Sequence, residues 1–150
     1  MPIEVASPEG RSLDHIDVVE IHRLHELGLE GPSTVPVLAP PYQIAQKLHA
    51  CTTVASDGRL NDRVHDLADL IMLDELTEFS LAETHAACIE VFSLRNMHAW
   101  PPTLTVWPHW PAIWDEIVLV DSFPVADVHE AVSKVESLIS RILAAPSAGA

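Results

Sequence analysis

The sequence predicts an α+β fold in which short N-terminal strands precede a mainly helical bundle of about five helices. Two patterns carry this prediction. Before residue 40, short runs of valine and isoleucine alternate with turn residues, which is typical of strands. After residue 40, apolar residues recur every three or four positions, which is the spacing of one helix face.

Three strands are predicted, over residues 3–6, 17–21 and 35–38, with a turn at 9–12 between the first two. Pro36 has no N–H to donate, so the third strand should lie at a sheet edge. Glycine and proline in residues 28–34 indicate a loop. The expected division is strands of a sheet over 1–39, a helical part over 40–145 and a disordered tail over 146–150.

The helices are placed by their apolar faces and their end signals. Adjacent prolines at 40 and 41 can open a helix that runs to about residue 53. Asn61 or Asp62 can cap a second helix that ends near residue 76. Ser80 and Glu83 form a capping box for a third, which should end near residue 96.

The last part of the chain alternates irregular and helical patterns. Residues 100–114 hold all four tryptophans and four prolines, and we expect an irregular hydrophobic clamp there rather than a base-stacking platform. A short helix should follow around residues 113–118. The final helix has the clearest apolar face, and Asp127 with Glu130 can cap its start.

The composition excludes several classes of protein. Hydrophobic residues make up 48% and charged residues 20%, which suits a packed core and not a disordered tail. Because no apolar run could cross a membrane and residues 1–10 lack a secretory pattern, we expect a cytoplasmic protein. Cys51 and Cys88 lie among apolar neighbours and should be buried thiols. The net charge of −14 argues against nucleic-acid binding by this chain alone, outside a local basic spot.

Lys47 is the first residue that departs from its surroundings. On a helix it shares a face with Ile44, Leu48 and Cys51, which should pack inward. A lysine there must extend its amine to solvent, pair with a carboxylate, or point into a site. Taken alone, the first of these is the more common arrangement.

Three aspartates form the second departure. Asp62, Asp66 and Asp69 fall on one ridge of the predicted helix and repel one another unless a cation or solvent intervenes. Arg63 is adjacent and could pair with Asp66 or Asp69. A solvated acidic face, with Asp62 as the cap, explains the pattern equally well.

The two departures together form a recognisable pattern. Residues 43–50, QIAQKLHA, are followed by residues 61–70, NDRVHDLADL. This pair resembles the KLHA … R-x-K-D-x-x-D-L signature of the AbiEii/AbiGii nucleotidyltransferase toxins, with His65 in place of a basic residue. Residues 92–101 are similar to the family's F-x-x-R-x-x-H-x-W-P stretch. The resemblance extends from about residue 35 to the final helix.

The resemblance implies a cleft shared by two parts. In complete members, an N-terminal lobe carries a Gly-Ser loop and paired aspartates that hold Mg²⁺ on an NTP. The helical part adds a lysine and an aspartate, and the enzyme transfers a nucleoside monophosphate to RNA, including tRNA ends. The implied catalytic residues here are Lys47, which would face phosphate, and Asp66, which would orient the attacking hydroxyl. The implied supporting residues are Arg63, Asp69, His65 and Arg95.

One part of the family pattern is missing from this sequence. The closest string to a Gly-Ser loop with an Asp-x-Asp pair, residues 10–17, has the wrong spacing. We therefore expect a chain that starts midway through the family's length and is inactive when isolated. The alternative is a non-catalytic module that pairs with an antitoxin, with a separate N-terminal half, or with a second copy of itself.

A third hypothesis is a small metal-binding or hydrolytic protein that uses the aspartate ridge with His65. A pair at His22 and His25 has the spacing of one helical turn, but no third ligand accompanies it. Both patterns are explained as well by solvated polar residues, so we rank this hypothesis last.

Overall fold

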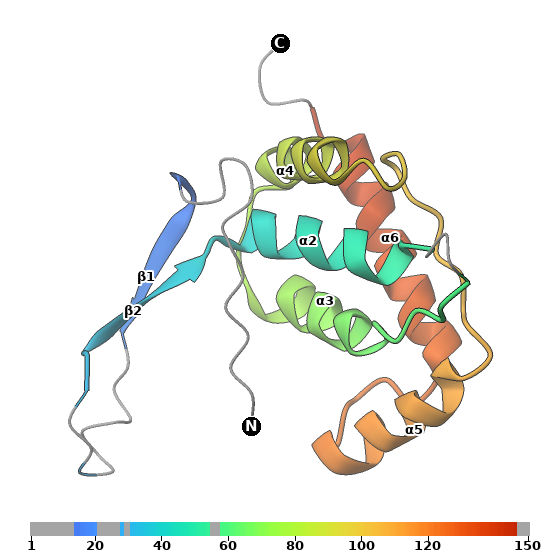
Figure 1. The fold of residues 1–150 in the computed structure, drawn as a ribbon. Helices are drawn as coiled ribbons and strands as arrows, with labels where there is room; N and C mark the ends of the chain where they lie inside the picture. The colour runs from blue at the N-terminus through green and yellow to red at the C-terminus, as the bar shows by residue number, and fades with distance from the viewer. Residues whose placement is uncertain (1–13, 21–27, 29–30, 55–57, 147–150) are drawn as a thin grey trace.

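The computed structural model describes residues 14–20, 28, 31–54 and 58–146. Two antiparallel strands lead into five helices (Figure 1), which confirms the predicted α+β class. The strands are β1 (Ile16–Glu20) and β2 (Thr34–Leu38). The helices are α2 (Pro40–Thr52), α3 (His65–Leu76), α4 (Leu81–Arg95), α5 (Trp110–Asp121) and α6 (Val128–Ala144). The strand predicted at 3–6, the turn at 9–12 and most of the predicted tail lie outside the described residues.

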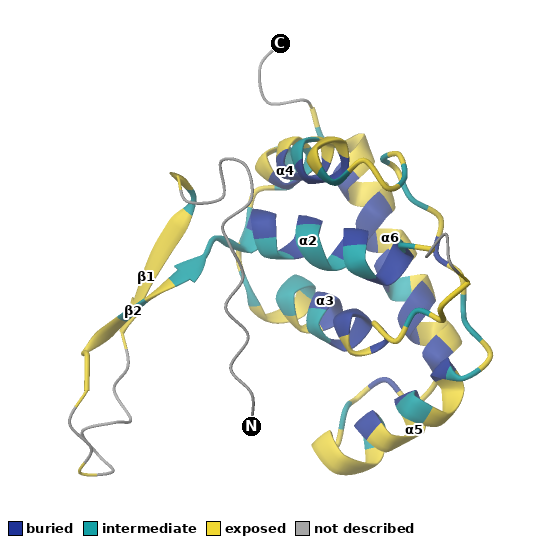
Figure 2. Ribbon diagram, in the orientation of Figure 1, coloured by how far each residue is buried: buried dark blue, intermediate teal, exposed yellow. Residues whose placement is uncertain are grey.

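The hairpin stands beside the helical part and is joined to it at one end (Figure 1). The strands pair from Ile16 with Leu38 to Glu20 with Thr34. At the base, the Ala39 N–H donates to the His15 carbonyl at 2.8 Å, and the His15 ring stacks on Tyr42 with centroids 4.5 Å apart. β1 is exposed along its whole length (Figure 2), so the sheet contributes little to the core.

Helix α2 lies between α3 and α4, and α6 packs against both of those helices (Figure 1). The face of α2 predicted to be buried is buried, with Ile44 and Leu48 fully inaccessible and Cys51 nearly so. Cys88 of α4 is also buried, and both thiols are free. The core is therefore built by helices, and it holds α2 in a fixed orientation against α3.

The start of α3 differs from the prediction. Neither Asn61 nor Asp62 caps it, because the helix begins at His65 without a side-chain cap. The Asn61 amide instead donates to the carbonyls of Ala50 and Thr53, at 2.9 and 2.8 Å, and its oxygen accepts from the Arg63 N–H. Asn61 thus satisfies the C-terminal carbonyls of α2, which otherwise would lack helical partners.

Other helix ends form as predicted. Ser80 Oγ accepts from the Glu83 N–H at 3.3 Å and starts α4. Asp127 accepts from the N–H groups of His129 and Glu130 and starts α6. The chain leaves α4 at Asn96, whose φ of 48° lies in the left-handed region that asparagine tolerates.

Helix α5 is longer than the predicted 113–118, because it begins at Trp110 with a proline in its first turn. Trp110 and Trp114 are fully buried. The Trp114 indole N–H donates to the Val125 carbonyl at 3.0 Å, which ties the chain after α5 back to the helix. These contacts support the expected hydrophobic clamp at this end of the tryptophan-rich segment. Over the described residues, no helix has the length and apolarity needed to span a membrane.

Candidate functional site

The site at the seam of α2 and α3 is centred on Lys47. Its Nζ donates to Asp66 Oδ1 at 3.1 Å and to Asp69 Oδ2 at 2.5 Å. Asp66 lies in the first turn of α3 and Asp69 lies one turn later, so both carboxylates face the same side. Lys47 and Asp66, the two residues that the resemblance implies as catalytic, thus come from neighbouring helices and meet.

The two carboxylates determine the charge state of Lys47. Partial burial lowers the pKa of its amine, but the hydrogen bonds and charges of Asp69 and Asp66 raise it more, and the net pKa lies above 10.5. The side chain is 27% exposed, compared with 13% for Asp66 and 48% for Asp69. Lys47 is therefore a cation at neutral pH, suited to stabilising negative charge and not to acting as a base.

The predicted acidic ridge divides into two parts. Asp62 precedes α3, is 81% exposed, and lies 3.0 Å from His109 Nε2. The repulsion between Asp66 and Asp69 is relieved by Lys47 of the neighbouring helix, whereas the sequence had suggested Arg63. The reason is geometric: Arg63 belongs to the turn before α3 and lines a different pocket.

Two pockets flank this cluster along the α2 and α3 surface. One, of about 370 Å³, contains Lys47 and Asp69 with a largely apolar wall that includes Met72, Leu73 and Leu76. The other, of about 450 Å³, contains Arg63 and Arg95. Five of the six predicted site residues thus fall into two groups: Lys47, Asp66 and Asp69 form the hydrogen-bonded cluster, and Arg63 and Arg95 line the second pocket. The sixth, His65, is exposed at the start of α3 and lines neither pocket.

Histidines connect α2 to the end of α4. Arg95 Nη1 donates to His49 Nδ1 at 3.4 Å. His98 Nε2 lies 2.8 Å from the Thr52 hydroxyl, which itself donates to the Leu48 carbonyl, so the imidazole is the donor. Burial lowers the pKa of His98, which favours this neutral form. These contacts give His98 and His49 a structural role between α2 and the end of α4.

The described residues do not fit a magnesium site. Among them, no group of three or more histidine, cysteine, aspartate or glutamate side chains is arranged to hold a metal ion. Asp66 and Asp69 are both directed at the Lys47 amine. We therefore assign no step of the chemistry to a metal held by these residues.

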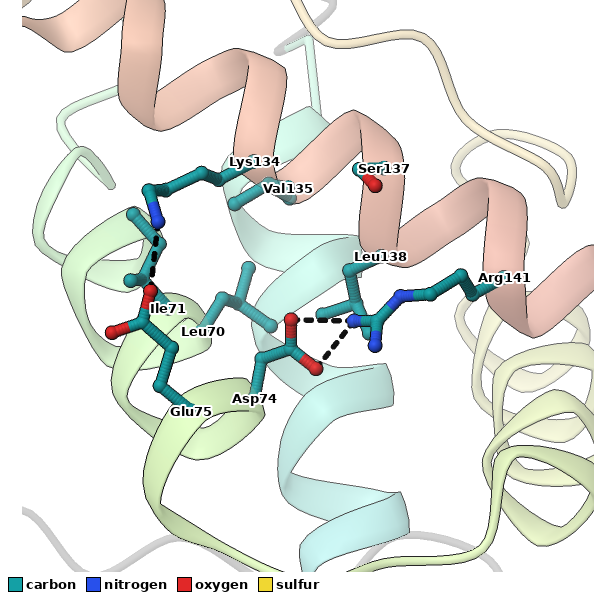
Figure 3. Close-up of a pocket in the computed structure, with 9 residues that line it drawn as sticks. All are labelled: Leu70, Ile71, Asp74, Glu75, Lys134, Val135, Ser137, Leu138 and Arg141. Carbon is teal, nitrogen blue, oxygen red and sulfur yellow. Dashed lines mark hydrogen bonds and ion pairs between the residues drawn. The ribbon is translucent and has the colours of Figure 1, made fainter.

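A further pocket, of about 360 Å³, lies between α3 and α6 (Figure 3). Its charged side chains pair across the groove: Arg141 Nη2 donates to both carboxylate oxygens of Asp74, and Lys134 donates to Glu75 at 2.8 Å. Leu70 and Leu138 form its apolar floor. The two ion pairs across this groove hold α6 against α3, and their four charged side chains neutralise one another. We therefore assign no chemistry to these four side chains.

The comparison with protein families agrees with the motif that carries Lys47 and Asp66. A family model described as "Nucleotidyl transferase AbiEii toxin, Type IV TA system" matches residues 3–137. The chain belongs to the AbiEii family. The family is one of nucleotidyltransferase toxins of type IV toxin–antitoxin systems, so an antitoxin is the partner that membership implies. No protein with a curated description matches the chain.

Sequence reasoning did not find Arg59, and it gave Asn61 a different role, as a possible cap of α3. Arg59 lines the same pocket as Arg63 and Arg95, and Asn61 holds the loop between them. Arg59 lies in a segment without helical or strand periodicity, so no local pattern marks it. For Asn61, the nearby Gly58 indicates a loop. It does not indicate the tertiary hydrogen bonds that the Asn61 side chain makes to the end of α2.

Proposed function

We propose that this chain supplies the lysine and aspartate half of an AbiEii-type nucleotidyltransferase site, acting on an NTP and an RNA acceptor. The observation that carries the proposal is the Lys47–Asp66–Asp69 cluster beside an open pocket. In the complete site, the Lys47 amine would give up its hydrogen bond to Asp66 and instead contact the negative charge that develops on the transferred phosphate. Asp66 would then be free to accept a hydrogen bond from the attacking hydroxyl. Arg63, Asp69, His65 and Arg95 would support these groups.

The proposal includes inactivity of the chain by itself. Phosphoryl transfer from an NTP in this family requires Mg²⁺ on paired aspartates, and this sequence contains no Gly-Ser loop followed by an Asp-x-Asp pair. The described carboxylates nearest Lys47 are already hydrogen-bonded to it. The missing groups would come from a lobe that carries them.

The test is transfer of label from each NTP to RNA, with Mg²⁺ present. The chain alone is expected to give no transfer above background. The chain combined with a family N-terminal lobe that bears the Gly-Ser and Asp-x-Asp motifs is expected to give transfer. Lys47→Met or Asp66→Asn should remove that transfer, whereas Lys134→Gln, remote from the site, should retain it. Lys47-dependent transfer by the chain alone would contradict the proposed incompleteness.

A second candidate function is a non-catalytic binding module. It is favoured by the exposed hairpin, in which Val18 is 68% and Val19 47% exposed and only two strands form the sheet among the described residues. Such a surface suits pairing with an antitoxin, with a separate N-terminal half, or with a second copy. Light scattering over a range of concentrations tests the last of these, and co-purification with a co-expressed antitoxin of the family tests the first.

A further inference from the structure

Three arginines line a pocket beside the contact between α2 and α3. Three of the chain's six arginines, Arg59, Arg63 and Arg95, line the pocket of about 450 Å³. Among the described residues of its lining, the one carboxylate is Asp62, which lies 3.0 Å from His109 Nε2. Among the described lining residues, arginines therefore outnumber carboxylates, in a chain whose net charge is −14.

The loop that carries Arg59 and Arg63 is held in place by hydrogen bonds of Asn61. Asn61 donates to the carbonyls of Ala50 and Thr53, and its own carbonyl accepts from the fully buried Trp110 indole at 2.6 Å. The Asn61 side-chain oxygen also accepts from the Arg63 N–H at 2.7 Å. The backbone between Arg59 and Arg63 is thus fixed by hydrogen bonds to α2 and to a core side chain, which preorganises the pocket.

The third arginine comes from α4 and not from this loop. Arg95 lies in the last turn of α4, and its Nη1 donates to Nδ1 of His49, which is 4% exposed. The same nitrogen also lies 3.3 Å from the Thr53 hydroxyl. His49 therefore lies in contact with both Arg95 and the end of α2, and it holds the guanidinium group of Arg95 beside the pocket.

We infer that this arginine pocket binds a phosphate group of the nucleotidyltransferase substrates, separately from Lys47. Guanidinium forks match phosphate oxygens in geometry and charge. Ala50, which lines the pocket, lies one helical turn after Lys47, so a phosphate bound here would lie beside the Lys47 cluster. The inference deepens the proposed function, and rests on it, by giving Arg63 and Arg95 a ligand and by adding Arg59. The phosphate could belong to a nucleotide or to the backbone of the RNA acceptor.

Binding to the full chain can be measured without catalysis. The probes are ATP and pyrophosphate by calorimetry, and a short labelled single-stranded RNA by fluorescence anisotropy, all at low salt. The variant is Arg59→Gln/Arg63→Gln, and the control is Lys134→Gln/Arg141→Gln, which removes the same charge at the α3–α6 groove. Loss of the charge-assisted bonds should weaken binding about tenfold or more in the first pair and less than about twofold in the control. Circular dichroism confirms that each variant is folded.

The outcomes separate the sources of the phosphate and the two proposals. Binding of RNA without the nucleotide assigns the pocket to the acceptor backbone, and the converse assigns it to the triphosphate. Lys47→Met should leave binding within about twofold of wild type, because the arginines remain. Absence of binding to every probe, or an equal loss in the control, would overturn the inference. Arginine-dependent binding without any Lys47-dependent transfer in the reconstituted assay would overturn the proposed function and leave the arginine pocket standing.

Discussion

At the scale of single residues, the charges of Lys47, Asp66 and Asp69 bear both on the stability of the fold and on the proposed chemistry. Two carboxylates one helical turn apart repel each other, and the amine from α2 offsets that repulsion. The cluster is also partly exposed beside a pocket, so a substrate phosphate can compete for the amine.

Removing the Lys47 charge is expected to destabilise the fold. Lys47→Met keeps the aliphatic stem but leaves Asp66 and Asp69 facing each other, and we expect the free energy of unfolding to fall by about 1–2 kcal/mol, between the values for surface and buried pairs. Urea unfolding measures this. Adding Asp66→Asn and Asp69→Asn to the lysine variant should recover most of the loss. No recovery would mean that lost packing, and not repulsion, is the cause.

The pH dependence of the Lys47 contribution follows from its pKa. Hydrogen bonds and charges from Asp69 and Asp66 outweigh burial and raise the folded-state pKa above 10.5, so the stabilisation is fully present below that pH. It is lost as the pH rises through the raised value. The difference in unfolding free energy between wild type and Lys47→Met should stay constant from pH 7 to about 10 and shrink above 10.5. Lys134 titrates in the same direction in both proteins and cancels in the difference. A difference that shrinks near neutral pH would contradict the assignment.

At the scale of helices, capping side chains differ in how much they contribute to stability. Asp127 accepts two backbone N–H bonds at the start of α6, the helix whose apolar face closes the core against α3 and α4. Asp127→Ala should lower the free energy of unfolding by about 1 kcal/mol, the usual cost of losing such a cap. Asp115→Ala, at an exposed position inside α5, is the matched control and should change it by less than about 0.5 kcal/mol. Equal effects in chemical denaturation would show that the cap is not the cause.

The elements that could be predicted are those with local causes. Helices α2 and α6 have apolar stripes and α4 and α6 have side-chain caps, and all three appear close to their expected bounds. The predicted start of α3 was wrong because the Asn61 side chain hydrogen-bonds to the end of α2. This tertiary contact overrides the preference of asparagine for a capping position. The short estimate for α5 was wrong because tertiary burial of Trp110 supports an extra turn that the prolines seemed to forbid.

The same distinction applies to the candidate site. Lys47 and Asp66 could be found because an apolar helix face makes a lysine conspicuous and because the spacing of the two motifs resembles a family. The arginine pocket could not be found in full, since Arg59, Arg63 and Arg95 come from a loop, a turn and a helix end. No sequence period relates these three positions, and only the packing of α2 against α4 brings them together.

At the scale of the whole molecule, the hairpin is the part that the helical core does not cover. The exposed side chains of β1 include Ile16, Val18 and Val19, and an outer strand edge presents backbone groups that can pair with another strand. The helices bury their main apolar faces against one another, and the apolar side chains that they leave exposed, such as Leu119, lie on helices whose backbone groups are already paired. We therefore expect any self-association of the isolated chain to occur through the hairpin and not through the helical part.

This expectation can be tested with two variants that add the same charge at different exposed apolar positions. Val18→Lys places a lysine on β1, where charge opposes strand pairing, and Leu119→Lys changes an 82% exposed leucine on α5. In light scattering, the average mass of the wild type should rise with concentration, Val18→Lys should remain near the 16.4 kDa monomer, and Leu119→Lys should follow the wild type. A wild type that stays monomeric at every concentration would contradict pairing between copies. Equal suppression by Leu119→Lys would instead mean that copies also associate through the exposed apolar surface of α5, because one added lysine only reduces the size of the net charge of −14 and so cannot increase the general repulsion between copies.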